Sequence, residues 1–291
     1  MAFFFWLKKY RETCGKKILC ICANNLRAEL FSISPYVDAI VTTDWLVFDF
    51  ISVYLAKKYN IHRSLLAHFD LKTIAAKEKL SADELKNYGI IGTIRDFLNI
   101  SADTKFEPYA VQIPPPVIEC IKNLFAQMNL IEGKTVLLVT SGYYYGNLEH
   151  HLTFWIKLRE KLNAAGYEVI TNSDKEIIPN CRNIFLSLLE SVVFAGLCGN
   201  IVSIPTGFVE SLMILNSTDK MNVQVIYPGD NDIYWRGEKN DVDKIVDDYI
   251  YYINIYLTSQ KIFSCYKWGN NDTEDDLLLE KIVQKITERT D

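Results

Sequence analysis

The sequence predicts an α/β protein with two Rossmann-like halves, and three observations carry this prediction. Apolar, β-branched runs alternate with amphipathic segments of helix length throughout residues 134–228. A less regular alternation occupies residues 1–113, and three consecutive prolines at 114–116 separate the two stretches. Such alternation implies parallel strands joined by crossover helices that cover both faces of a sheet.

The first half begins with an apolar helix, expected over residues 3–13 and ending near Gly15. Its apolar N-terminal run is too short to span a membrane, so we interpret the helix as packed on its own domain. A peripheral membrane contact stays open as the alternative. Further strands and helices are expected at residues 17–22, 39–41, 45–58 and 75–98.

The proline run is the best boundary in the chain, because consecutive prolines are stiff and cannot continue a helix. We therefore predict an N-terminal α/β domain over residues 1–113 and a C-terminal Rossmann-like domain over residues 117–255. Residues 256–291 are expected to form a helical tail that packs back, with its last helix at 274–289.

The second half has the clearest element pattern. Its first strand is a β-branched run at 135–140, and Gly166 is expected to end the helix that follows. The expected helices lie at 117–130, 151–165, 186–197 and 208–216, and the remaining strands at 167–170, 200–204 and 223–227.

Two polar turns follow strands of this half. One contains Ser141 and Gly142, and the other is Pro205-Thr206-Gly207. Ligands of open parallel sheets bind at the carboxyl ends of the strands, where both turns are expected to lie. A helix N-terminus there offers unpaired N–H groups and partial positive charge to an anion. The pattern therefore predicts a binding site for a phosphorylated compound.

Composition and missing motifs exclude several other functions. The net charge of −5 disfavours a nucleic-acid binder, which usually carries a basic surplus. No metal-spaced HExxH, no P-loop, no GxGxxG after a strand and no GxSxG elbow occur. The seven cysteines are scattered without a CxxC pair, which favours buried structural thiols and a reducing cytoplasm.

Two Rossmann-like halves, a stiff linker and a helical tail resemble the GT-B glycosyltransferases. The second half is most similar to the heptosyltransferase-like and bacterial fucosyltransferase-like polysaccharide enzymes. The similarity lies in a strand ending in a small-residue turn (135–142), a Gly-Tyr-Glu-Val strand start (166–169) and a hydroxyl residue plus glycine opening a helix (203–210). The resemblance implies two domains with a cleft between them, the first on the acceptor side.

The resemblance also implies roles for individual residues. Thr206 and Gly207 would hold the donor diphosphate, and Glu210, one turn into the helix, would hold the donor ribose. The remaining donor-binding candidates are Ser141, Gly142, Tyr143 and Lys175. Plainer interpretations stay open: Thr206 as a helix cap, Glu210 as a solvated helix residue, and Lys175 as part of a surface charge cluster.

The N-terminal half departs from the family pattern. GT-B enzymes usually start with a strand and a glycine-rich turn, whereas this chain begins at the helix that should follow that strand. The N-terminal strand is therefore expected to be missing, and the catalytic base has no family position. The candidates for a base are Asp44, Asp49, His62 and His68, of which we select Asp44 and His68.

The sequence thus predicts a cytoplasmic glycosyltransferase of the hexosyl- or heptosyltransferase type. It would move a sugar from a nucleoside-diphosphate sugar to a glycan or lipid-linked acceptor in surface polysaccharide synthesis. No cofactor and no obligatory metal are expected. The alternatives are a non-catalytic GT-B-like binding protein or partner subunit, and a nucleotide-sugar epimerase.

Overall fold

The structure is a computed structural model of the 291-residue chain, and it divides into two compact units. The first comprises Met1–Gln112 and Lys244–Tyr252, and the second Ile113–Asp243 and Ile253–Asp291. The division between Gln112 and Ile113 lies directly before the proline run. The residues that the structure describes are 2–15, 17–22, 25–43, 54, 57–58, 98, 100–101, 104, 111–140, 152–173, 178–204, 206–212, 221–227, 263–268 and 272–288.

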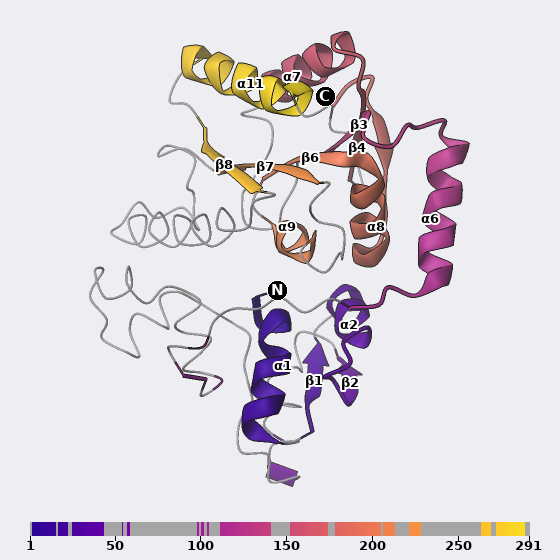
Figure 1. The fold of residues 1–291 in the computed structure, drawn as a ribbon, viewed down its shortest axis with the longest axis vertical. Helices are drawn as coiled ribbons and strands as arrows, with labels where there is room; N and C mark the ends of the chain where they lie inside the picture. Colours follow the sequence, from indigo (N-terminus) through magenta and orange to yellow (C-terminus); the bar gives the residue numbers. More distant parts are fainter. Residues whose placement is uncertain are drawn as a thin grey trace, which may run out of the picture. The chain divides into compact units, whose positions relative to one another are not determined.

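The described part of the first unit is a small α/β motif. Helices α1 (Ala2–Cys14) and α2 (Asn25–Ser32) accompany strands β1 (Leu19–Cys22) and β2 (Ala39–Thr42), which pair in parallel (Figure 1). The side chains of Phe4, Trp6 and Leu7 in α1 are buried, and the Phe4 ring packs edge-on against Phe31 at 5.8 Å. The contact between Phe4 and Phe31 joins α1 to α2, which agrees with the interpretation of α1 as a helix packed on its own domain.

A carboxylate ties this motif together. Asp38 accepts a hydrogen bond of 2.7 Å from the Ile18 backbone N–H, at the start of β1. It also accepts bonds of 2.7 and 3.1 Å from the two Nη atoms of Arg11 in α1. The Ile18 N–H and the Arg11 guanidinium together hold the pKa of Asp38 below its usual value. One side chain therefore joins α1, β1 and the turn before β2.

The second unit contains a parallel sheet of six strands. Their order is β5-β4-β3-β6-β7-β8, and all five neighbouring pairs are parallel. The strands are β3 (Thr135–Val139), β4 (Glu168–Asn172), β5 (Arg182–Ile184), β6 (Gly199–Ser203), β7 (Asn222–Tyr227) and β8 (Phe263–Lys267). The predicted α/β class with a parallel sheet is confirmed.

Helices cover both faces of this sheet, as Figure 1 shows. One face carries α7 (Leu152–Ala164) and α11 (Asp272–Thr287), whose apolar side chains share one core with the sheet. The other face carries α8 (Leu188–Cys198) and α9 (Gly207–Ser211), and α6 (Pro115–Gln127) packs on α8 through the rings of Phe125 and Phe194 at 5.3 Å. Every residue of β3 is buried, as expected for a strand covered on both faces.

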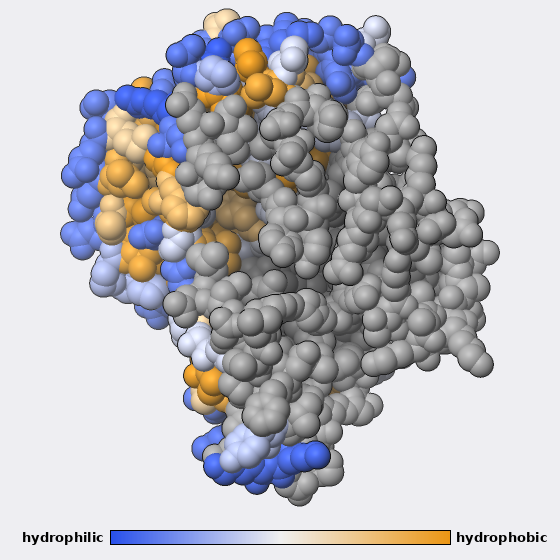
Figure 2. All heavy atoms as spheres, turned by 180° about the vertical axis from the view of Figure 1, so that it is seen from behind, coloured by the Kyte–Doolittle hydropathy of each residue, from blue (hydrophilic) through white to orange (hydrophobic). Residues whose placement is uncertain are grey.

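Two surface ion pairs and one buried hydrogen bond connect α11 to its neighbours. Lys157 and Lys161 of α7 pair with Asp276 and Glu280 of α11, each at 2.7 Å. The surface over these two helices is mainly hydrophilic in Figure 2. Because both pairs are exposed, they contribute little stability. The hydroxyl of Tyr167 is buried and donates to the Ile286 carbonyl at 3.1 Å, which anchors the C-terminal end of α11 on the sheet.

Local sequence signals end and begin these helices. Gly166 follows α7 with a φ of +83°, a conformation that glycine adopts without strain and that ends the helix as expected. Ser187 begins α8 with a capping box, since its hydroxyl accepts from the Glu190 N–H and Glu190 accepts from the Ser187 N–H.

The structure also differs from the sequence prediction. The tail predicted as helical, 256–291, contains strand β8 before its helix α11, and neither β5 nor α2 was expected. β5 has three residues and β8 mixes polar with apolar ones, so neither shows the apolar run of a buried strand. The helices expected at 45–58 and 75–98 lie, apart from residues 54, 57, 58 and 98, outside the described residues.

Among the described thiols, three are buried, two are partly buried and that of Cys120 is exposed, and none of them is in a disulfide. Burial raises the pKa of Cys20 and of Cys265 to about 12, and that of Cys181 to about 11. Such thiols are poor nucleophiles, in keeping with the structural role that the sequence predicts. Within the described residues, no helix is long and apolar enough to cross a membrane.

The hydrogen bonds of Asp38 to Ile18 and Arg11 can be tested by measuring how the stability of the protein depends on pH. Because the folded-state pKa of Asp38 is lowered, its contribution to stability is present above about pH 4 and is lost as pH falls through the folded-state pKa. We expect the stability difference between wild type and Asp38→Asn to shrink as pH falls from 6 to about 2, measured by urea unfolding. Asp276→Asn is the control. A stability difference between wild type and Asp38→Asn that does not change with pH would contradict the stabilising role of the Asp38 carboxylate.

Candidate functional site

The winding of the six-stranded sheet defines the candidate site. From β3 the chain moves outward to β4 and β5, then returns through α8 to the other side of β3 and moves outward again through β6, β7 and β8. The direction of winding therefore reverses between β3 and β6. In open parallel sheets, ligands bind outside the carboxyl ends of the strands at such a switch point.

Backbone pairing brings the two segments at the switch point together. β3 and β6 pair from Thr135 opposite Gly199 to Val139 opposite Ser203. One further hydrogen bond follows, from the Ile204 N–H to the Val139 carbonyl at 3.1 Å. The residues that come next, Thr140 after β3 and Thr206 after β6, therefore leave the same edge of the sheet from adjacent strands.

Both threonines carry a hydroxyl that is buried. The Oγ1 atoms of Thr140 and Thr206 are shielded from solvent and have no hydrogen-bond partner among the described residues. Thr140 as a whole is 1% exposed. A buried hydroxyl without a partner costs about 1–3 kcal/mol, so such a group in a native protein calls for an explanation, of which a bound water, ion or ligand is one. Two of them on adjacent strand ends indicate a place built to hydrogen-bond a ligand.

The geometry at Thr206 distinguishes two interpretations of this residue. A helix cap would accept a backbone N–H of α9 through the side-chain oxygen. Instead, the Thr206 backbone carbonyl accepts from the Val209 N–H at 3.0 Å, while Oγ1 stays unpaired among the described residues. Thr206 therefore does not cap α9 with its side chain, and its hydroxyl remains available to a ligand. Gly207, the first residue of α9, is exposed.

A third unpaired polar atom lies deeper in the fold. Trp155, in the first turn of α7, is fully buried, and its Nε1 has no hydrogen-bond partner among the described residues. Its ring packs edge-on against Phe154 at 5.6 Å and Trp268 at 5.8 Å. Because this indole sits within an aromatic cluster of the core, we do not count it in the site.

A network of hydrogen bonds joins polar side chains at the carboxyl ends of β4 and β5, on the same edge of the sheet. The Asn172 side chain donates to Ser191 Oγ at 2.7 Å and accepts from the Leu186 N–H at 3.2 Å. Thr171 Oγ1 donates to Asn183 Oδ1 at 2.8 Å. These bonds connect the ends of β4 and β5 to the first turn of α8, and the sequence analysis did not identify them.

The structure describes only part of the predicted site. Thr206 and Gly207 lie at the switch point, and Glu210 lies within α9. The other predicted site residues are outside the described residues and stay predictions: Ser141, Gly142, Tyr143, Lys175, Asp44 and His68. Among the described residues, no group of three or more His, Cys, Asp or Glu side chains can hold a metal ion.

Thr140 is the residue that sequence reasoning missed. The sequence predicts it as the last residue of the strand at 135–140, whereas the strand ends at Val139. The available signal was its position, because a hydroxyl directly after an apolar buried run lies at the carboxyl edge of the sheet. Its value as a site residue appears only once the strand order places it beside the segment of Thr206.

Comparison with known proteins identifies the fold. No protein-family model and no curated protein matches the chain. Among solved structures, E. coli ADP-heptose LPS heptosyltransferase II is similar, with a TM-score of 0.59 and 11% identity over 99% of this chain and 95% of that one. A glycosyl transferase of family 9 from Veillonella parvula DSM 2008 has a TM-score of 0.55 and 9% identity, covering 98% and 92%.

These likenesses confirm the predicted resemblance at the level of fold. Both solved structures are matched over nearly their whole length, so the similarity covers both units and the C-terminal segment. At 9–11% identity they show the fold alone. The function must therefore be argued from the site of this chain.

Replacing the Thr140 hydroxyl tests whether it is free in the unliganded protein. Thr140→Val removes a hydroxyl without a described partner, so we expect the free energy of unfolding to stay unchanged or rise slightly. Thr171→Val is the matched control: Thr171 is equally buried, at 1% exposure, but its hydroxyl is bonded, so about 1 kcal/mol should be lost. Equal losses in urea unfolding would show that the Thr140 hydroxyl has a partner within the protein.

Proposed function

We propose that this protein is a glycosyltransferase that binds a nucleoside-diphosphate sugar at the switch point between β3 and β6. Two observations support the proposal. The chain shares its fold with two glycosyltransferases over almost the whole of each chain. The hydroxyls of Thr140 and Thr206 at the switch point have no hydrogen-bond partner among the described residues, and this is the observation on which the proposal rests.

The donor diphosphate fits this pair of hydroxyls. Each threonine would donate its O–H to a phosphate oxygen, which relieves the cost of the unpaired groups. Gly207 presents no side chain, so a phosphate can approach the backbone at that point. These donors would be fixed before the ligand arrives and would stabilise the charge that develops on the departing diphosphate. Glu210 is proposed to hold the ribose, with Ser141, Gly142, Tyr143 and Lys175 completing the donor site.

Transfer would proceed by attack of an acceptor hydroxyl on the anomeric carbon of the donor sugar. The new C–O bond forms as the bond to the diphosphate breaks, and the nucleoside diphosphate leaves with the electron pair. A base takes the proton of the acceptor hydroxyl, and Asp44 and His68 remain the candidates. The proposal includes two Rossmann-like domains, with the acceptor bound by the first. No obligatory metal or other cofactor is part of it.

The proposed setting is the synthesis of a surface polysaccharide or glycoconjugate in the cytoplasm. The acceptor would be a glycan or a lipid-linked glycan, and the sugar transferred a hexose or heptose. The second candidate function is a non-catalytic binding protein of the same fold. It is favoured by the chemistry at the switch point, where the described groups are hydroxyls that bind but do not exchange protons near neutral pH.

A thermal-shift screen tests the donor site. We expect one of the UDP-, GDP-, ADP- or CMP-linked sugars to raise the melting temperature, because a ligand that binds only the folded state stabilises it. Thr206→Tyr should abolish the shift by filling the switch point. Thr42→Tyr, at an exposed position of β2, is the control and should keep it. A shift that survives Thr206→Tyr would place the ligand elsewhere.

Catalysis is tested separately from binding, with the nucleotide sugar that gives the shift. Release of nucleoside diphosphate in the presence of glycan or lipid-linked acceptors would support transfer. Binding without release, over a broad acceptor panel, would favour the non-catalytic protein. No shift with any nucleotide sugar would contradict the donor site and favour a non-catalytic protein that binds a partner instead.

A further inference from the structure

Phe185 is an aromatic side chain held in solvent at the carboxyl edge of the six-stranded sheet. It directly follows β5, and 74% of it is exposed, the highest value among the large hydrophobic residues that the structure describes. The other exposed large hydrophobics in the described regions are Tyr54, Ile131 and Leu277, and none of these follows the carboxyl end of a strand of this sheet. Among the described residues, Phe185 is therefore the one exposed aromatic ring at the edge that carries the candidate site.

The backbone on both sides of Phe185 is fixed. Before it, the Ile184 carbonyl accepts from the Ser173 N–H at 2.9 Å. After it, the Leu186 N–H donates to Asn172 Oδ1 at 3.2 Å, and the same asparagine donates to Ser191 Oγ at 2.7 Å. The ring is thus presented from a bonded turn, and a ligand that stacks on it need not order that backbone.

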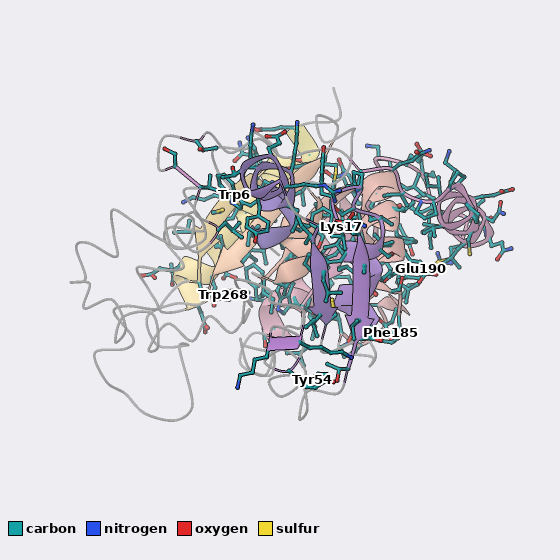
Figure 3. The ribbon with its side chains drawn as sticks, turned by 90° about the horizontal axis from the view of Figure 1, so that it is seen from below. Trp6, Lys17, Tyr54, Phe185, Glu190 and Trp268 are labelled. Atoms are coloured by element: carbon teal, nitrogen blue, oxygen red, sulfur yellow. The ribbon has the colours of Figure 1, made fainter. Side chains whose placement is uncertain are left out.

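The position suits one end of a nucleotide whose other end lies at the switch point. β5 is two strands from β3, so Phe185 lies about 10 Å across the sheet edge from the Thr140 segment. A nucleoside diphosphate in an extended form bridges a distance of this order between its phosphates and its base. Figure 3 shows Phe185 on the same side of the unit as Glu190 of α8, away from Trp268, which follows β8 at the opposite end of the sheet.

We propose that Phe185 is the stacking platform for the base of the bound nucleotide. This proposal rests on the proposed donor site, and it adds a binding residue that the sequence analysis did not identify. The phenyl ring would lie against the face of the base, covering two apolar surfaces that are otherwise in water. Because a phenyl ring carries no hydrogen-bonding group, it contributes affinity for a base without selecting among bases.

Calorimetric titration of four proteins tests the platform: wild type, Phe185→Ala, Phe185→Leu and Phe185→Trp. The probes are ADP, GDP, UDP and inorganic pyrophosphate, which has no base. We expect Phe185→Ala to weaken binding of the preferred nucleoside diphosphate about tenfold and to leave pyrophosphate binding unchanged. Phe185→Leu keeps an apolar side chain without a ring and should bind the nucleotide as weakly as Phe185→Ala. Phe185→Trp keeps an aromatic ring and should bind it about as tightly as wild type. Because Phe185 is exposed, all variants should fold.

The outcomes separate this proposal from the donor site. Unchanged nucleotide affinity in Phe185→Ala, or rescue by leucine, would overturn the platform and leave the donor site standing. If wild type binds pyrophosphate as tightly as it binds the nucleotide, the base contributes no affinity, which would also overturn the platform and leave the donor site standing. Failure of wild type to bind pyrophosphate and every nucleotide would remove the donor site, and the platform with it. In Phe185→Trp, quenching of the new indole fluorescence by the bound base would directly support stacking.

Discussion

The parallel pairing of β3 with β6 is the constraint on which the rest of the second unit depends. β3 is the first strand in the chain to enter the sheet and lies in its interior, so every later strand must be added on one side or the other. The sheet grows first towards β5 and then, after α8 crosses back, towards β8. This reversal leaves the carboxyl ends of β3 and β6 side by side, an arrangement that is set by the winding rather than by any one residue.

The hydrogen bonding of polar side chains differs between the two ends of the central strands. Towards the amino ends, buried amides satisfy one another: Asn200 donates to the Gly133 carbonyl at 3.0 Å, and Asn222 donates to Asn200 and to the Lys285 carbonyl. Gln224 and Tyr266 extend this network to β8. At the carboxyl ends, Thr140 and Thr206 have unpaired hydroxyls among the described residues. Among the described residues, the polar side chains at the amino ends of β6 and β7 are therefore hydrogen-bonded within the protein, whereas the two threonine hydroxyls that follow β3 and β6 are not.

Much of this architecture follows from local sequence signals, and the exceptions have physical reasons. The buried run of β3, the stop at Gly166 and the capping box at Ser187 are encoded locally, so their elements could be predicted. The two edge strands were not predicted because β5 has only three residues and β8 mixes polar with apolar residues, so neither has a continuous apolar pattern. The roles proposed for Thr140 and Phe185 depend on which strands are neighbours, which is long-range information that no window of sequence contains.

A crystal structure of the full chain soaked with the nucleoside diphosphate that binds most tightly tests the central claim most directly. We predict the diphosphate at the carboxyl ends of β3 and β6, with a phosphate oxygen within about 3 Å of each of the Thr140 and Thr206 hydroxyls. A diphosphate at any other edge of the sheet, with both hydroxyls still unpaired, would contradict the account.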